Sequence, residues 1–250
     1  MRWRERAEKM ALRVLPRVIY PEFTAPIYFE RRSFPRNRLV RLLYGLFVWN
    51  YELVTVERIV EIPFVFKNLD LDRGARVLDF GCNESPVSMH LASLGYEVVG
   101  VDLNPYPFTH PNFTFVAGDF LKSRFPPDHF DAVIAISAVE HCGLAAYGDG
   151  VEDRGDEKVV GEMWRILKPG GRLLVTIPYG RAATTSWYRV YDKAGLGRLL
   201  AAFAISKAEY YAGIGRKAWR PVTAEELAAV DSAALGFAQG VACVVALKPS

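Results

Sequence analysis

The sequence predicts an α/β fold in which a doubly wound, mostly parallel sheet of seven strands follows a helical N-terminal extension. Two observations predict it. From residue 75 onward, short apolar segments of strand length alternate with longer segments whose apolar residues recur at helical spacing. The chain has 250 residues, of which 51% are hydrophobic and 24% charged, which suits one globular domain with an extension.

Residues 1–70 are predicted to form the basic helical extension, and residues 71–250 the main domain. The first 44 residues hold ten Arg and one Lys against four Glu, and prolines divide the extension into short pieces. Residues 37–69 have apolar side chains at helical spacing, enough for two helices. The extension can be a lid over the main domain, which we favour, or a basic face that rests on an anionic membrane surface.

Strands and helices alternate through the main domain, which implies right-handed crossovers and a mostly parallel sheet. The strands are predicted from short apolar runs at 75–80, 96–102, 113–119, 130–137, 172–178, 203–212 and 240–248. The helices are predicted from helical periodicity and from flanking Gly and Pro at 86–95, 155–171, 192–203 and 223–230.

Charge and cysteine usage exclude several classes of protein. The net charge of +3 argues against an extended nucleic-acid surface. Cys82, Cys142 and Cys243 lie far apart, so they have neither the spacing of a zinc site nor that of a disulfide scaffold. The longest apolar run near the start, at 42–49, is too short for a membrane span. We expect a cytoplasmic protein, and the sequence leaves its oligomeric state open.

The turn after the first predicted strand reads "VLDFGCNESP" at 77–86. Gly81 allows the backbone to approach a ligand closely because it has no Cβ. Asn83 tolerates a left-handed backbone, and Ser85 followed by Pro86 is typical of a helix start. Each of these residues therefore has a structural reason, although the three-glycine turn usual in a nucleotide-binding fold would have glycines in place of Asn83 and Ser85.

Acidic residues end the first three predicted strands. Asp79, Asp102 and Asp119 should meet at one edge, because ligands bind at the carboxyl ends of parallel strands where the strand order reverses. A carboxylate at Asp102 can accept both hydroxyls of a ribose. Asp119 can accept a hydrogen bond from an adenine amino group, with the Phe120 amide nearby. The alternative is that these aspartates only form turns.

Five segments taken together resemble the ordered motifs of class I S-adenosylmethionine-dependent methyltransferases, over roughly residues 60–250. The segments are "VLDFGCNESP", "VVGVDLNP", "FVAGDF", "FDAVIAISAVEH" and "RILKPGGRLLVTIP". The resemblance implies S-adenosylmethionine as cofactor and the strand order 3-2-1-4-5-7-6 with the last strand antiparallel. Residues 106–121 and 140–158 also resemble a bacterial subgroup associated with the modification of surface sugars or polysaccharides.

The same resemblance implies roles for individual residues. Asp79 would lie near the methionine amino group, Gly81 and Cys82 would line the methionine moiety, and Asp102 and Asp119 would bind ribose and adenine. The residues predicted to contact the cofactor are Asp79, Gly81, Cys82, Asn83, Asp102, Leu103, Asn104, Asp119, Phe120 and Ser137. Tyr51, Glu57 and Glu61 could also reach its methionine end.

The segment after the fourth strand, 138–158, supplies the groups for proton transfer. We expect His141 to act as a general base, with Glu140 beside it, because imidazole titrates near neutral pH. His141 can instead hold the loop or line the cofactor. Glu140 and His141 with Asp149 or Asp153 could also hold Mg²⁺, but adjacent residues rarely bind one ion together and we predict no metal.

Aromatic and basic residues are predicted to line the acceptor pocket. They are Tyr147, Tyr179, Trp187 and Arg189, and Tyr188, Tyr191, Tyr210, Tyr211, Trp219 and Arg220 can join them, although such residues often only pack in a core. Aromatic faces suit sugar rings or flat phenols. We therefore expect a methyl transfer to an oxygen of a small molecule or sugar, with no nucleic-acid partner.

Two other functions stay open. A nicotinamide-dependent oxidoreductase would need a turn with three glycines to hold a pyrophosphate, and this turn has one of them. A non-catalytic partner subunit of the same fold would be expected to have lost the strand-end acids, whereas Asp79, Asp102 and Asp119 are all present.

Overall fold

The structure is a computed structural model that describes residues 55–83, 85–148, 150–215, 218–235 and 238–250. The predicted extension at 1–54, including Tyr51, therefore lies outside the described residues, as do Glu84 and Asp149. Residues Glu57–Ser250 form one compact unit, and the description below concerns this unit. No helix in the described part of the chain is long and apolar enough to cross a membrane.

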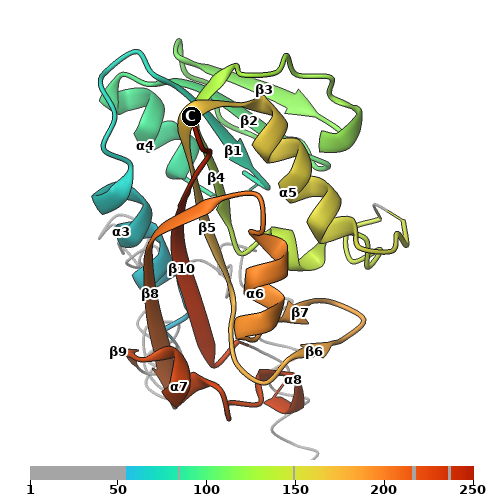
Figure 1. The fold of residues 1–250 in the computed structure, drawn as a ribbon. Helices are drawn as coiled ribbons and strands as arrows, with labels where there is room; N and C mark the ends of the chain where they lie inside the picture. Colours follow the sequence, from blue (N-terminus) through green and yellow to red (C-terminus); the bar gives the residue numbers. More distant parts are fainter. Residues whose placement is uncertain (1–54, 84, 149, 216–217, 236–237) are drawn as a thin grey trace, which may run out of the picture. The chain divides into compact units, whose positions relative to one another are not determined.

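An eight-stranded sheet forms the centre of the unit (Figure 1). Its order is β3-β2-β1-β4-β5-β10-β8-β9, in which β3, β2, β1, β4 and β5 are parallel and β10 is antiparallel to both of its neighbours. The strands are β1 (Arg76–Phe80), β2 (Glu97–Asp102), β3 (Phe113–Ala117), β4 (Phe130–Ile136), β5 (Leu167–Pro178), β8 (Ala204–Ile214), β9 (Ala218–Val222) and β10 (Gly240–Leu247).

This topology confirms the predicted doubly wound sheet and its strand order. The sheet has one strand more than the seven predicted. This strand, β9, lies at the edge of the sheet and pairs antiparallel with β8. A two-stranded ribbon of β6 (Ala183–Thr184) and β7 (Arg189–Val190) lies in the connection after β5.

Helices cover both faces of the sheet, as the right-handed crossovers of a parallel sheet require. Figure 1 shows α3 (Arg58–Asn68) and α4 (Val87–Leu94) on one side, and α5 (Gly155–Ile166) and α6 (Lys193–Leu199) on the other. Alternate residues of each strand enter two separate cores. In β4, Ala132 and Ile134 pack toward α3 and α4, whereas Val133 and Ala135 pack toward α5 and α6.

Helix α3 belongs to the core although its residues fall within the predicted extension. Phe64, Val65 and Leu69 are buried in the cluster that α3 and α4 share with the sheet. The compact unit accordingly begins at Glu57 rather than at the predicted boundary after residue 70.

The helix predicted at 155–171 ends at Ile166, where β5 begins with Leu167. Pro169 disfavours a helical backbone at Lys168, and Gly170 adopts a φ of 76° while its amide bonds the Lys248 carbonyl at 2.9 Å. The Pro-Gly-Gly sequence therefore starts the strand instead of closing the helix. Two other predicted helices are also shorter: α6 ends at Leu199, and the helix at 223–230 is only α7 (Ala224–Leu227).

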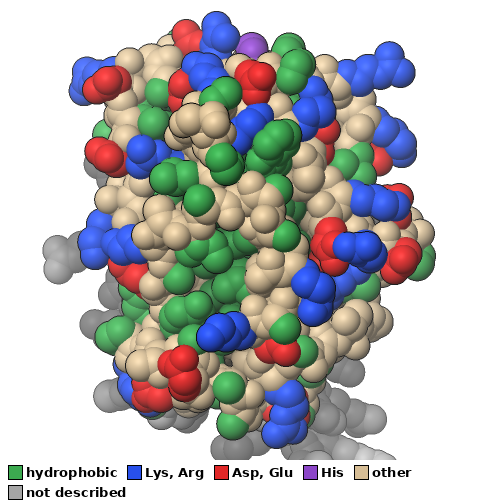
Figure 2. All heavy atoms as spheres, viewed as in Figure 1, with side chains coloured by type: hydrophobic (Ala, Val, Ile, Leu, Met, Phe, Trp, Pro, Cys, Tyr) green, Lys and Arg blue, Asp and Glu red, His purple; other side chains and the backbone are tan. Residues whose placement is uncertain are grey.

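The remaining helical turns are short. They are α8 (Ser232–Leu235) and the 3₁₀ turns η2 (Phe120–Lys122) and η3 (Val139–His141), of which η2 follows β3 and η3 follows β4. On the face shown in Figure 2, basic and acidic side chains are interspersed, so this face presents no broad basic area.

Removing packing volume from the sheet should destabilise the unit. Leu174→Ala empties a fully buried position in β5 and should lower the free energy of unfolding by about 2–5 kcal/mol. Leu94→Ala makes the same chemical change at a position 47% exposed and should cost under about 1 kcal/mol. Urea denaturation of both variants measures the difference, and similar losses would contradict this assignment of the core.

Candidate active site

The strand order reverses at β1, and doubly wound sheets have their ligand-binding crevice at the carboxyl end of such a point. β1 pairs with β2 on one side and with β4 on the other. The connection after β1 runs into α4 on one face, and the connection after β4 runs into α5 on the other. Because these two loops leave in opposite directions, the strand ends between them are open to a ligand.

Gly81 is required by the close approach of these two loops. Its φ is 71°, and a Cβ placed on it would come within 2.7 Å of the Ala138 Cβ in the loop after β4. Its amide bonds the Val101 carbonyl of β2 at 2.9 Å. A side chain here would meet both a strained backbone and a neighbouring methyl group, so glycine keeps the crevice open.

Asp102 fixes the turn after β1 from the neighbouring strand. Its Oδ2 accepts from the Asn83 amide at 2.9 Å, and its Oδ1 accepts from the Asn104 amide at 2.8 Å. Each carboxylate oxygen retains a second lone pair for a ligand hydroxyl. The predicted left-handed backbone at Asn83 is wrong, since the positive φ in this turn belongs to Gly81. Asn83 instead contributes its main-chain donor, which any residue except proline could supply.

Asp79 is buried at the end of β1. Its Oδ2 accepts from the Ser88 hydroxyl of α4 at 2.6 Å. Burial raises the pKa of Asp79 to about 7. The hydrogen bond from Ser88 lowers this pKa, and the negative charge of Asp102 raises it. A cationic group placed beside this carboxyl would therefore stabilise its ionised form.

The Cys82 thiol is buried against β2. A Cβ on Gly100 of β2 would come within 2.8 Å of its Sγ, and burial raises the pKa of the thiol. The sequence predicts Ser85 as the helix N-cap, but α4 begins one residue later, with Pro86 as its N-cap and no side-chain capping bond. The Ser85 Oγ accepts from the Val87 amide at 3.2 Å. Leu103, next to Asp102 in the chain, is exposed.

Asp119 lies two residues after the end of β3 and caps the short turn η2. Its Oδ1 accepts from the Leu121 amide at 3.0 Å, and its Oδ2 lies 2.9 Å from the Lys122 Nζ. This carboxylate thus forms a turn, as the alternative interpretation holds, and it still has lone pairs for a ligand donor. The ring of Phe120 packs in the core against Phe80, with centroids 5.1 Å apart, so only the main chain of Phe120 is suited to ligand contact.

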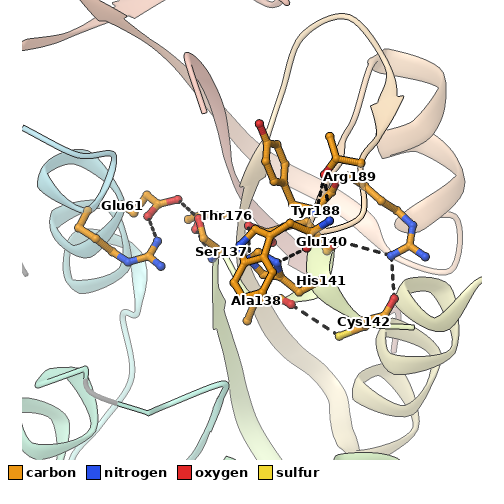
Figure 3. A network of polar contacts seen from close by, with 12 residues as sticks. Glu61, Ser137, Ala138, Glu140, His141, Cys142, Thr176, Tyr188 and Arg189 are labelled. Atoms are coloured by element: carbon orange, nitrogen blue, oxygen red, sulfur yellow. Dashed lines mark hydrogen bonds and ion pairs between the residues drawn. The ribbon is translucent and has the colours of Figure 1, made fainter. Parts of the chain in front are cut away.

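Ser137 joins the end of β4 to α3 in a strained conformation. Its φ is 42°, and its amide bonds both the carbonyl and the hydroxyl of Thr176 on β5. Its own hydroxyl donates to the Glu61 Oε1 at 2.6 Å, and Glu61 is paired with Arg58 (Figure 3). A non-glycine residue held at positive φ by several bonds is typical of a functional turn.

His141 lies in η3 with its ring orientation fixed from the loop after β5 (Figure 3). Its Nδ1 is 2.6 Å from the main-chain oxygen of Trp187. A carbonyl oxygen can only accept, so Nδ1 carries a proton and the neutral ring presents Nε2 as the basic atom. That Nε2 lies 3.8 Å from the Glu140 Oε1.

Glu140 is a buried carboxyl without full hydrogen bonding. Its side chain is 2% exposed, and its Oε2 has no hydrogen-bond partner within the described part of the chain. Burial raises its pKa to about 8, and the charges of Glu61 and Glu57 act in the same direction. Glu140 is therefore mostly protonated at neutral pH, which places a proton beside the His141 ring.

Arg189, predicted to bind the acceptor, instead holds the loop that carries these two residues. Its Nη1 donates to the Cys142 carbonyl at 2.7 Å and to the Glu140 carbonyl at 3.3 Å. Its Nε lies 3.7 Å from the Asp156 Oδ2, which also accepts from the Tyr191 hydroxyl at 2.7 Å. Arg189 thus links the ribbon β6–β7 to the end of β4.

Two of the predicted acceptor aromatics form a partly exposed cluster with His141. Tyr147 and Trp187 are 53% and 47% exposed, and their ring centroids are 4.8 Å apart. Each ring also contacts the His141 ring, at 5.3 and 5.6 Å. Tyr179 lies elsewhere, since it is buried in the core against Tyr210 with centroids 4.9 Å apart.

Of the other predicted aromatics, Tyr188 is buried, with its hydroxyl on the Ser232 carbonyl at 3.0 Å. No group of three metal-ligating side chains occurs among the residues that the structure describes, and Asp149 of the alternative magnesium site is outside them.

Several contacts of the site are absent from the sequence prediction. The Ser88 hydroxyl on Asp79 could have been found, because Ser88 faces inward in the first turn of the helix after the loop. The Trp187 carbonyl on His141 carries no sequence signal, because any residue has a carbonyl and the two positions are 46 residues apart.

Comparison with known proteins adds to this geometry. Residues 78–175 match the family model of a methyltransferase domain. The matched segment is less than half of the chain, so the chain is similar to a methyltransferase domain over this part. The match runs from β1 to β5 and spans the turn at Gly81, Asp102, Asp119, Glu140 and His141. These residues end or follow strands on the carboxyl side of the sheet.

Relatives of known name are similar to part of this chain. The sterol 24-C-methyltransferase of Yarrowia lipolytica is 33% identical over 115 residues, which is 41% of this chain and 27% of the relative. The chain thus matches about a quarter of the length of that relative.

Solved structures share the methyltransferase fold at low identity. A 1,6-didemethyltoxoflavin-N1-methyltransferase of Burkholderia thailandensis, solved with its substrate and S-adenosylhomocysteine, has a TM-score of 0.56 at 18% identity and covers 85% of this chain and 89% of its own. The N-methyltransferase NodS of Bradyrhizobium japonicum was solved with S-adenosylhomocysteine and has a TM-score of 0.53 at 17% identity. The match covers 78% of this chain and 88% of NodS. The expected bacterial sugar-modifying subgroup finds no support among these relatives.

The raised pKa of Glu140 predicts how stability depends on pH. In the folded protein this carboxyl keeps its proton up to about pH 8, whereas in the unfolded chain it ionises near its ordinary value of 4.5. The unfolded state therefore loses a proton first, and stability should fall as the pH rises between these values. Glu140→Gln removes the titration.

Melting temperatures at pH 5 and pH 9 measure this effect. The Glu140→Gln variant should lose less stability than the wild type between the two values. The exposed Glu152→Gln change serves as control, because Glu152 lies on the surface. An unchanged pH dependence in Glu140→Gln would show that Glu140 ionises normally in the folded protein.

Proposed function

We propose that this chain is a methyltransferase that uses S-adenosylmethionine to methylate a small-molecule acceptor. The observation that carries the proposal is the arrangement at the ends of β1 and β2. Gly81 leaves the crevice open, and both oxygens of Asp102 are aimed by the amides of Asn83 and Asn104. The matched domain model and the S-adenosylhomocysteine bound by two fold relatives support the same cofactor.

The residues present fit that cofactor. Asp102 has lone pairs for the two ribose hydroxyls, and Asp119 with the Phe120 main chain can receive adenine. Asp79 and Glu61 supply buried carboxyls for the ammonium group of the methionine moiety. When bound, S-adenosylmethionine supplies a methyl group on a sulfonium, which is transferred by direct displacement.

His141 is proposed to remove a proton from the acceptor. The Trp187 carbonyl keeps the proton on Nδ1, so Nε2 is ready to accept one. The imidazolium so formed would lie 3.8 Å from the Glu140 Oε1, whose partial negative charge stabilises it. Arg189 holds the loop of both residues in place and thereby contributes to the alignment that a displacement reaction needs.

The acceptor is proposed to present a flat apolar face. Tyr147 and Trp187 offer exposed rings beside the proposed base. Relatives named sterol methyltransferases favour an apolar ring system, whereas the expected sugar oxygen has no such support. We retain a cytoplasmic location as part of the proposal, supported by three cysteines that form no disulfide.

Isothermal titration calorimetry tests the cofactor. The wild type should bind S-adenosylmethionine and S-adenosylhomocysteine and should not bind NAD. Asp102→Asn should weaken binding of S-adenosylhomocysteine by about tenfold or more, because one ribose hydroxyl and one loop amide lose a charged acceptor. Asp72→Asn makes the same change on the surface before β1 and should leave the affinity unaltered. Absence of binding to the wild type at sub-millimolar ligand would overturn the proposal.

Steady-state kinetics test the base. The enzyme is first incubated with S-adenosylmethionine and a panel of sterols, phenols, amines and sugars. The compound that causes S-adenosylhomocysteine to be released is the acceptor. With that acceptor, His141→Asn should lower kcat by about 10²–10⁴-fold and leave the affinity for S-adenosylhomocysteine within about twofold. His129→Asn, just before the opposite end of β4, is the matched control. Equal loss of rate and affinity would instead assign His141 to the cofactor pocket.

A further inference from the structure

The turn after β1 makes two hydrogen bonds to side chains from another part of the chain. Asn83 and Ser85 stand where the glycine-rich turn of a nucleotide-binding fold has glycines. Asn83 is hydrogen-bonded through its main chain to the last residue of β2, and Ser85 to the segment that follows β2. The Asn83 amide donates to Asp102, and the Ser85 carbonyl accepts from the hydroxyl of Tyr106 at 2.5 Å. The second of these bonds has no role in the chemistry described above.

Tyr106 is a rigid donor. It is 8% exposed, and its ring packs among aromatic side chains from its own loop and from β3. The ring centroids of Phe108, Phe113 and Phe115 lie 5.6, 5.1 and 6.1 Å from its own. Burial raises the pKa of the Tyr106 hydroxyl, so it stays neutral and keeps its proton to donate. The position of the hydroxyl is therefore set by the sheet and not by the turn.

The Ser85 carbonyl lies at the point where the turn becomes a helix. The hydrogen bonds of α4 start one residue later, with the His90 amide on the Pro86 carbonyl at 3.0 Å. The bond from Tyr106 thus satisfies the carbonyl that directly precedes the helix. It also fixes the far end of the segment from Gly81 to Pro86, whose near end is fixed by the Gly81 amide on Val101.

We propose that Tyr106 is a positioning residue for the cofactor, which acts by holding the Ser85 carbonyl and with it the turn at 81–86. The inference rests on the proposed function, because it assumes that this turn receives S-adenosylmethionine. A turn that is already in its bound shape does not lose conformational entropy when the ligand arrives. Tyr106 and Asp102 together hold a turn that has a single glycine.

The test compares two tyrosines that each donate to a carbonyl. The Tyr96 hydroxyl bonds the Leu71 carbonyl at 3.1 Å before the start of β2, whereas Tyr106 follows the end of the same strand. Tyr106→Phe and Tyr96→Phe each remove one hydroxyl and leave the ring. Calorimetry with S-adenosylhomocysteine and thermal unfolding without ligand are measured for both variants and for the wild type.

Tyr106→Phe should weaken binding of S-adenosylhomocysteine by about five- to tenfold, as the loss of one hydrogen bond predicts. Tyr96→Phe should change it by less than about twofold, with a similar fall in melting temperature for both. With the acceptor identified, KM for S-adenosylmethionine should rise in Tyr106→Phe while kcat is retained. Hydrogen exchange in the ligand-free protein should be faster in a peptide spanning 81–94 for Tyr106→Phe only.

The outcomes separate this inference from the proposed function. Affinity within twofold of the wild type in Tyr106→Phe, or an equal loss in Tyr96→Phe, overturns the positioning role alone. Failure of the wild type to bind S-adenosylhomocysteine overturns the proposed function and this inference with it. A selective loss in Tyr106→Phe together with faster exchange at 81–94 supports the inference.

Discussion

The parallel pairing of β1 with β2 and β4 is the constraint on which the site depends. Since each strand must be followed by a crossover, and since the crossovers on either side of β1 pass to opposite faces, the loops at the carboxyl ends of β1 and β4 separate. The two loops come closest at Gly81 and Ala138, where a Cβ on Gly81 would lie 2.7 Å from the Ala138 Cβ. Apart from Asp119 and Phe120, which follow β3, every polar group assigned to the cofactor or to proton transfer lies at the end of β1, β2 or β4, in the loop that follows it, or is bonded to one of these.

The site is held by main-chain groups from distant parts of the chain. The His141 ring is oriented by a carbonyl of the loop after β5, Asp102 is oriented by two amides, and Arg189 holds two carbonyls of the loop after β4. Against these favourable bonds stands Glu140, a buried carboxyl with an oxygen that lacks a hydrogen bond. Burying such a group without a partner costs free energy, and functional sites are where proteins retain such exceptions.

The sequence alone predicted the alternation of strands and helices and the convergence of Asp79, Asp102 and Asp119, because apolar period and strand-end position are local properties. The strand order came from the resemblance to a family, since nothing local says which strands are neighbours. The backbone at Asn83 was predicted wrongly, because tolerance of a left-handed conformation does not require it and Gly81 met the demand. The end of α5 was misplaced because Pro-Gly-Gly can close a helix or begin a strand. The partner of the His141 Nδ1 was beyond prediction, because a main-chain acceptor has no residue type.

The place of β10 in the sheet has a consequence for how the chain assembles during synthesis. β10 follows β8 and β9 in the sequence, yet it lies between β5 and β8 and pairs with both. While the ribosome is still making residues 204–222, the edge of β5 has no partner and the β8–β9 hairpin has no sheet to join. The first five strands can form a parallel core early, but that core exposes an unpaired edge until β10 is made. Closure of the sheet is therefore a late, long-range step.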